Sequence, residues 1–415
     1  MKNKFSHFNC SICGATYEPD EVTYTCPKDG GNLNVILDYE TLKQQYSPDN
    51  FMDLPEASLW RYINLLPVSD PGGHGTPIHR AGWTPVYKPP RLAKKLGLQH
   101  VWVKDESPNP TASFKDRASA IVVARALEIG AEVTVAASTG NAGAALAGMS
   151  AAIGSQAVIF APKTAPPAKI AQLIVFGARV LLVDGNYDQA FDLSIEATEN
   201  FGWYNRNTGY NPFTAEGKKT AAFEIWEQVI RQLPADGKRL TVFISVGDGN
   251  IISGVYKGFK DLHALGWLEK IPRIIGVQSE GSAAIANTFH KGNEIIEAVQ
   301  ANTLADSISV DLPRDGVRAI RAARETGGTY LTVPDNAILK AIADLGRVGI
   351  FAEPAASTAY AGLVKAVDES LVSDDDPVLV LSTGSGLKDV NAAMQAVSDA
   401  PVIAPTLDAV KKVLE

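Results

Sequence analysis

Cysteine is scarce in this chain of 415 residues: there are only three, and all lie within the first 26 positions. That placement excludes a disulfide framework for the whole chain and favours a local role near the N-terminus. Long apolar runs are also absent, since no stretch approaches the roughly 20 apolar residues that a membrane span needs. The first residues, MKNKFSHFNC, lack the apolar core of a signal peptide. We therefore expect a cytoplasmic protein that does not bind membranes.

Basic charge is in short supply, with 38 Lys and Arg against 46 Asp and Glu and a net charge of −8. This balance argues against nucleic acid or an anionic membrane surface as a partner. Charged residues make up 20% and hydrophobic residues 46% of the chain, as in an ordinary soluble enzyme. The length is sufficient for two or three domains with a large core.

The cysteines lie in one short segment, CSICGATYEPDEVTYTCPKDGG. It resembles a zinc ribbon, in which a second Cys-x-x-Cys pair completes a tetrahedral site. An aspartate stands here where the fourth cysteine would be. Two alternatives stay open: a zinc site of three thiolates and one carboxylate, or a degenerate ribbon that keeps its shape without metal. The candidate ligands, within a ribbon-like segment at residues 1–38, are Cys10, Cys13, Cys26 and Asp29.

From about residue 100 the sequence alternates between two patterns. Ala-rich stretches with helical spacing, such as RASAIVVARALEIG and NAGAALAGMSAAIG, separate short β-branched runs. This alternation predicts βαβ units and a mainly parallel sheet with helices on both faces. Ligands of such sheets bind at the carboxyl ends of the strands, so the loops there should carry the chemistry. The predicted strands are 101–105, 132–138, 157–162, 179–184, 240–246, 273–280 and 377–383.

Three loops stand out by their composition. NPTASFKDR places Lys115 beside the apolar Phe114, STGNAG (138–143) precedes a helix, and VGDGN (246–250) joins a strand to a helix. A glycine-rich turn at a helix start offers free N–H groups and the helix dipole to a phosphate. The turn matches neither Walker A nor G-x-G-x-x-G, which counts against ATP and dinucleotides. A phosphate site and a reactive lysine together predict a cofactor that carries a phosphate and an aldehyde.

These motifs also support a family resemblance. With FAEPAAS and STGSGLKD, and in this order and spacing, they resemble the pyridoxal-phosphate enzymes of fold type II, most closely the threonine synthase family. The flanking phrases SLWRYINLLPV, GWTPVYKPPRLAKKLGL and AEGKKTAAFEIWEQ agree. The resemblance implies a tryptophan synthase β-like α/β fold of two open parallel-sheet domains after the ribbon. The large cofactor-binding domain would comprise 39–127 and 207–415, and the small mobile domain 128–206.

The resemblance implies a role for each matching position. Lys115 would form the Schiff base with pyridoxal phosphate and act as the general base, with Phe114 packed beside it. Asn141 would hydrogen-bond the ring hydroxyl, and Thr383 would face the pyridine nitrogen, where a neutral hydroxyl favours elimination or replacement over transamination. The cofactor phosphate would be held by Gly247, Asp248, Gly249, Asn250 and Ile251. The substrate would contact Ser138, Thr139, Asn141, Ala142, Asn207 and Thr208.

The chain departs from the family pattern at two positions. Ala142 stands where the family has the last threonine of STGNT, and Thr214 in NPFTAEG stands where an arginine is common. Both changes remove donors to a substrate phosphate, so Lys115, Asn207, Thr208 and an arginine from elsewhere would have to compensate. We expect Asp248 to point away from the cofactor phosphate, and we assign Glu353, as a helix-start acid, no role.

The expected function is that of a threonine synthase, which converts O-phosphohomoserine and water to threonine and phosphate. One alternative is a related β-elimination or β-replacement enzyme with a remodelled phosphate site, such as a cysteate synthase or a serine/threonine dehydratase. Another is a non-catalytic binding protein with this fold. The expected partners are a small amino-acid substrate, phosphorylated under the first reading, and a second copy of the chain. The C-terminal APTLDAVKKVLE should form an amphipathic helix packed on the core or on the partner subunit.

Overall fold

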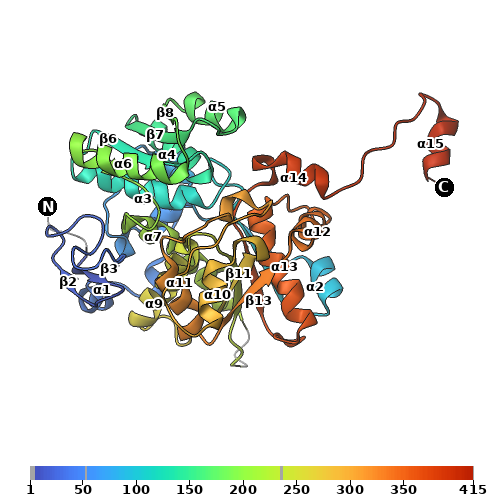
Figure 1. Cartoon of the computed structure of the whole chain (residues 1–415). Coiled ribbons are helices and arrows are strands. Elements are labelled where there is room, and N and C mark those ends of the chain that lie inside the picture. The colour runs from blue at the N-terminus through green and yellow to red at the C-terminus, as the bar shows by residue number, and fades with distance from the viewer. Residues whose placement is uncertain (1–4, 52–53, 234–236, 415) are drawn as a thin grey trace.

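The computed structural model describes residues 5–51, 54–233 and 237–414. Within them, a small N-terminal antiparallel sheet is followed by two larger, mainly parallel sheets that are flanked by helices (Figure 1). The predicted α/β fold is confirmed, and each of the seven predicted strands is present with its ends within one or two residues. None of the described helices is long and apolar enough to cross a bilayer.

The larger sheet has six strands in the order β12-β11-β10-β13-β5-β4. All neighbours are parallel except β4, which pairs antiparallel with β5 at one edge. Every residue of the central strands β10 and β13 is buried, as expected for β-branched runs covered on both faces. The sequence analysis missed β12 and the short β4. The bounds are β4 Val86–Tyr87, β5 Val101–Asp105, β10 Thr241–Ser245, β11 Arg273–Ser279, β12 Thr329–Val333 and β13 Val378–Ser382.

The smaller sheet has the order β8-β7-β6-β9, and all its strands are parallel. Alternate side chains of β6 enter different cores: Val135 and Ala137 pack with Phe191 of α6, whereas Ala136 packs with the helices of the opposite face. The predicted domain limits at 128 and 206 enclose this sheet and remain a prediction. The bounds are β6 Val133–Ala137, β7 Gln156–Pro162, β8 Arg179–Val183, β9 Tyr204–Asn205 and α6 Tyr187–Phe201.

The N-terminal segment forms the sheet β2-β1-β3, with β1 His7–Cys10, β2 Thr16–Tyr17 and β3 Leu33–Ile36. Its apolar face packs on the body, since the rings of Phe5 and Phe8 lie 5.8 and 6.3 Å from that of Phe213. Phe213 opens a helix next to the active-site pocket, so the ribbon supports that part of the fold.

The last helix lies apart from the others. α15 lies at the end of an extended segment that leaves the body, and none of its residues is buried (Figure 1). The predicted helix is present, but it does not pack on the core of its own chain. The bounds are α1 Tyr39–Gln45, α2 Pro90–Leu96, α3 Lys115–Glu128, α4 Asn141–Ala152, α5 Pro167–Val175, α7 Phe213–Lys218, α8 Thr220–Gln228, α9 Asn250–Ala264, α10 Ala284–His290, α11 Gly316–Glu325, α12 Asp335–Gly346, α13 Pro354–Asp368, α14 Val390–Gln395 and α15 Leu407–Leu414.

Candidate active site

The three predicted loops meet in one pocket of about 600 Å³. Its walls include residues 138–142 after β6, 245–252 at the end of β10, and Thr383 after β13. Lys115, at the start of α3, and Glu353, just ahead of α13, complete the same wall. The pocket therefore lies at the carboxyl ends of the parallel strands, where the sequence placed it.

Backbone hydrogen bonds join the loops that carry the chemistry. The N–H of Phe114 donates to the carbonyl of Thr383 at 2.9 Å, and the N–H of Glu353 donates to the carbonyl of Gly384 at 3.0 Å. Phe114 itself is fully buried in the main core. These bonds fix the backbone on which Lys115 is mounted, so the position of the amine is set by rigid elements.

Lys115 is the first residue of α3 and is partly exposed, on the pocket side. Burial lowers the pKa of its amine from the usual 10.5 to about 8. The carboxylate of Glu353 acts in the opposite direction, and the guanidinium of Arg206 lowers the pKa further. A substantial fraction of this amine is therefore neutral near pH 7 to 8, as a nucleophilic or basic lysine requires.

The turn at residues 247–249 forms a cradle at the start of α9. Gly249 has φ +90°, and a Cβ there would lie 2.6 Å from the carbonyl oxygen of Asp315. A Cβ on Gly247 would lie 2.8 Å from the Cα of Ile308. No side chain caps this 15-residue helix, so its first N–H groups are available to an anion. The turn thus has the shape and polarity that a phosphate needs.

Asp248 is the exception to the polarity of this turn. Its carboxylate accepts a hydrogen bond from the N–H of Arg314 at 3.2 Å, and burial raises its pKa. Its orientation away from the cofactor phosphate remains a prediction.

Asn141 and Glu353 form an unexpected pair. Asn141 opens α4, and its Nδ2 lies 3.0 Å from each carboxylate oxygen of Glu353. Glu353 does occupy the N-cap position of α13, but its side chain makes no cap bond and instead enters the pocket. Burial raises its pKa. Reading Glu353 as only a helix-start acid therefore overlooked a pocket residue.

The residues predicted to contact the substrate divide into two groups. Ser138, Thr139 and Ala142 line the pocket at the start of α4. Asn207 also lines it, but its amide is occupied: Oδ1 accepts from the N–H of Ala137 at 2.8 Å and Nδ2 donates to Ser194 Oγ at 2.8 Å. Asn207 therefore mainly fixes the end of β6. Ser138, Thr139 and Ala142 remain as the predicted residues that a ligand can contact.

Two buried cations in the pocket were not predicted. Arg206 donates to Thr208 Oγ1 at 2.8 Å, whereas its Nη2 has no partner among the described residues. Burial lowers the pKa of Arg206 to about 10. Lys218 is fully buried, donates to the side chain of Asn250, and has a pKa well below its usual value because of burial and of the nearby Lys115. These two side chains give the pocket buried donors for an anionic ligand.

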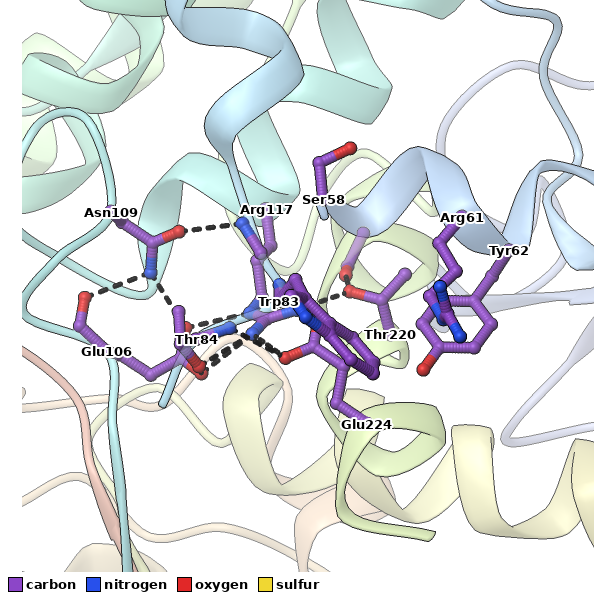
Figure 2. Close-up of polar contacts among 12 residues, drawn as sticks. Ser58, Arg61, Tyr62, Trp83, Thr84, Glu106, Asn109, Arg117, Thr220 and Glu224 are labelled. Carbon is purple, nitrogen blue, oxygen red and sulfur yellow. Dashed lines mark hydrogen bonds and ion pairs between the residues drawn. The ribbon is translucent and has the colours of Figure 1, made fainter. Parts of the chain in front are cut away.

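A buried charge network lies beneath the lysine loop. Arg117, two residues after Lys115, donates from Nε and Nη2 to Glu106 at 2.7 and 2.8 Å and from Nη2 to Glu224 at 2.7 Å. Figure 2 shows its guanidinium between these carboxylates. Lys104 Nζ lies 2.8 Å from Glu224, and all four side chains are fully buried. Burial raises the pKa of Glu224, but Arg117 and Lys104 outweigh it and hold the pKa at about 2.

The ribbon gathers its four candidate ligands. One ligand atom from each lies within 4.8 Å of the others, and the three cysteines form no disulfide. The Sγ atoms of Cys13 and Cys26 are 3.7 Å apart, and Cys10 Sγ lies 3.4 Å from an oxygen of Asp29. A tetrahedral ion with sulfur and oxygen ligands suits this donor set.

Comparison with known proteins agrees with the pocket. Residues 79–384 match the family model "Pyridoxal-phosphate dependent enzyme". Threonine synthases from Methanocaldococcus jannaschii and Methanosarcina acetivorans are 37% and 36% identical to the chain, with 98% of each chain covered. The chain belongs to the threonine synthase family. It is a pyridoxal-phosphate-dependent lyase, and the low-pKa lysine and the glycine cradle fit that cofactor.

Solved structures show the same fold at lower identity. The processed form of threonine deaminase isoform 2 from Solanum lycopersicum has a TM-score of 0.65 at 23% identity, covering 76% of this chain and 88% of that one. Maize serine racemase has a TM-score of 0.63 at 22% identity, covering 75% and 91%. Both likenesses concern the fold and carry no conclusion about the substrate of this threonine synthase family member.

Cofactor capture should depend on pH through Lys115. Because only the neutral amine attacks an aldehyde, the rate at which cofactor-free protein takes up pyridoxal phosphate should rise with pH, with a midpoint of about 8. Glu353→Gln removes a charge that raises this pKa, so it should move the midpoint lower. Stopped-flow absorbance over a pH series measures both. Glu369→Gln, at the other end of α13, is the control. A midpoint near the roughly 10.4 of a free lysine would contradict this account.

Proposed function

We propose that this chain is a threonine synthase that releases phosphate from O-phosphohomoserine and adds water to form threonine. The observation that carries the proposal is a second anion-binding group, Arg206, in the pocket that holds Lys115 and the glycine turn. A substrate with both a carboxylate and a phosphate needs such a group in addition to the turn for the cofactor phosphate.

The proposed cofactor contacts follow from the residues of the pocket. When bound, pyridoxal phosphate supplies an aldehyde for the substrate amine and an electron sink that acidifies the substrate Cα–H. Lys115 Nζ holds the aldehyde and then moves the proton at Cα. Asn141 donates to Glu353 and would exchange its long contact with Ser307 Oγ, at 3.4 Å, for one with the ring hydroxyl, while the Thr383 hydroxyl would face the pyridine nitrogen. The N–H groups at the start of α9 would bind the phosphate, and the amine of Lys218 lies on the same pocket wall.

The proposed substrate contacts replace those lost at Ala142 and Thr214. Thr214 is fully buried, and its hydroxyl donates to the carbonyl of Asn211 at 2.8 Å, so it takes no part in the pocket wall. Arg206 has a free Nη2 and holds the hydroxyl of Thr208 beside it. We assign the substrate phosphate to these two side chains. The carboxylate is assigned to Ser138 and Thr139 at the start of α4, where the helix dipole favours an anion.

Three further features belong to the proposal. Zinc binds the ribbon through Cys10, Cys13, Cys26 and Asp29, and metal analysis of the purified protein tests this assignment.

Residues 128–206 close over the substrate and exclude water. The chain forms a homodimer in which α15 packs on the partner, because this helix lies away from the body (Figure 1) and its apolar residues are exposed. The molar mass in solution, with and without the segment after Asp399, tests the dimer.

The deciding assay is release of phosphate from O-phosphohomoserine by the cofactor-loaded protein, with threonine measured in the same tube. Equal amounts of phosphate and threonine support the proposal. A cofactor-loaded protein that releases neither would contradict it and favour an elimination or replacement enzyme with a remodelled phosphate site. O-phosphoserine, serine and threonine would then be tried as substrates.

Arg206→Met should lower kcat/KM for O-phosphohomoserine by about 100-fold, which corresponds to about 3 kcal/mol of lost transition-state binding. The reason is that the phosphate loses the pocket arginine whose buried Nη2 has no partner among the described residues. The absorbance of the bound cofactor should be unchanged. Arg179→Met, on the exposed start of β8, is the matched control. Equal activity of both variants would exclude Arg206 from substrate binding.

A further inference from the structure

A second cluster of ionisable side chains lies away from the active-site pocket. It brings together Asp70 and His74 from the loop SDPGGHG and His79 from a 3-10 turn, η3 (Pro77–Arg80). Glu56, just ahead of a second 3-10 segment, η2 (Leu59–Leu65), faces His79 from the other side. None of these four residues contributes to the pocket wall.

The distances match those of metal ligands. His79 Nε2 lies 3.3 Å from one oxygen of Asp70, and His74 Nε2 lies 3.7 Å from the other oxygen. One ligand atom from each of the three lies within 4.8 Å of the others, and the two imidazole rings are 4.3 Å apart. A tetrahedral ion with bonds of about 2.0–2.2 Å holds neighbouring ligand atoms about 3.3–3.6 Å apart. Small side-chain movements would therefore complete such a site.

The surroundings of His79 point to a ligand as well. This side chain is only 7% exposed, its Nδ1 has no hydrogen-bond partner among the described residues, and Glu56 Oε2 lies 3.8 Å from that atom. As the structure stands, an Nε2–H would donate to the carbonyl of Gly72 at 3.1 Å. Moving that proton to Nδ1, which faces Glu56, would free the Nε2 lone pair for a cation beside the carboxylate of Asp70. A carboxylate behind the imidazole is the usual support of a metal-bound histidine.

The local backbone holds these groups in place. Asp70 Oδ1 accepts from the N–H of Gly72 at 2.8 Å, and Glu56 Oε1 accepts from the hydroxyl of Ser58 at 2.5 Å. Gly72 and Gly75 have φ of +74° and +85°, so the loop turns back and brings His74 over His79. Both carboxylates are thus oriented before any ligand arrives.

We propose that Asp70, His74 and His79 bind a divalent transition-metal ion of the zinc class, with Glu56 positioning His79. Imidazole nitrogens with a carboxylate favour zinc, cobalt or nickel over calcium and magnesium. The ion would tie the loop to η3, which leads directly into the segment Gly82–Thr84 above the buried network around Arg117. The site is separate from the ribbon, whose ligands are mainly thiolates.

Cobalt titration of the metal-free, cofactor-loaded full chain tests the proposal. Cobalt bound to thiolates gives charge-transfer bands, so the ribbon can be followed separately by absorbance. We expect a further equivalent of Co²⁺ to bind without such bands and to shift two imidazole N–H resonances strongly in the proton NMR spectrum. Zn²⁺ should displace it, and excess Mg²⁺ should not.

His74→Ala should weaken this second binding event by at least about 100-fold, and Glu56→Gln by about 10–100-fold. His74 is mostly exposed, so its replacement should leave the fold intact. His7→Ala, which changes a histidine outside the cluster, should leave the second event unchanged. Wild-type affinity in His74→Ala, or the same loss in His7→Ala, would overturn the proposal. So would the absence of a second event in the wild type, in which case the cluster is a set of ion pairs.

Discussion

Lys115→Ala should lack the visible absorbance of the lysine–cofactor link and should lose threonine formation by at least about 10⁴-fold. The size of this loss follows from two roles of one amine, since Lys115 would hold the cofactor and move the proton at Cα. Water cannot replace this amine. Burial sets its pKa at about 8, and the backbone bonds of the loop set its position. Absorbance after dialysis and a coupled phosphate assay measure both effects.

The pocket supplies its own control for this prediction. Lys218 is also buried, also has a lowered pKa, and lines the same pocket. Lys218→Ala should keep the absorbance and lose affinity for the cofactor, because it removes only a charge beside the phosphate. Borohydride reduction followed by peptide mapping shows which lysine carries the cofactor in the wild type. Label on Lys218, or an unchanged spectrum in Lys115→Ala, would contradict the assignment.

The sequence was sufficient to place the candidate pocket at the strand ends. Periodicity located β5, β6, β10 and β13 because their residues are β-branched and buried, and parallel pairing then forces their carboxyl ends together. Lys115, Asn141 and Thr383 were found because they lie in loops that directly follow or face those ends. The sequence analysis did not predict β12. It also did not predict β4, because a strand of two residues shows no alternation.

The pocket residues Lys218 and Glu353 were missed because tertiary packing, and not a local sequence pattern, decides where their side chains point. Lys218 and Lys219 are adjacent in AEGKKT, yet Lys218 enters the pocket whereas Lys219 pairs with Glu216 and Asp261. Consecutive helical residues point about 100° apart, and only the packing of α7 decides which one faces the ligand. Glu353 meets Asn141 across 212 positions of the chain, a contact that no local pattern encodes.

The charged side chains of the pocket bear on how the chain would bind a phosphorylated substrate although Ala142 and Thr214 depart from the family pattern. The pocket wall carries Lys115, Lys218 and Arg206 beside the carboxylates of Asp248 and Glu353, and burial raises the pKa of both acids. It is also lined by Asp188, Asp306, Asp311 and Arg314. A doubly anionic substrate would find these donors within a chain whose net charge is −8.

Arg117→Met should destabilise the protein by about 3–5 kcal/mol, because it leaves Glu106 and Glu224 buried with only Lys104 to compensate them. For a chain of this size we expect the thermal midpoint to fall on the order of 5 °C. The variant should also lose cofactor affinity, since Arg117 anchors the first turn of α3, which begins at Lys115. Differential scanning calorimetry and cofactor titration measure the two effects.

Arg125→Met on the same helix is the matched control. Its partner Glu128 lies 3.2 Å away on the next turn, and both side chains are partly exposed, so this pair should contribute only about 0.3–0.5 kcal/mol. Arg117→Lys separates charge from shape: it keeps the positive charge and loses the paired hydrogen bonds, and should fall between the other two variants. If Arg117→Met unfolds at the same temperature as Arg125→Met, the buried network does not support the lysine loop. The rigidity of that loop must then come from its backbone bond to Thr383 and from the core around Phe114.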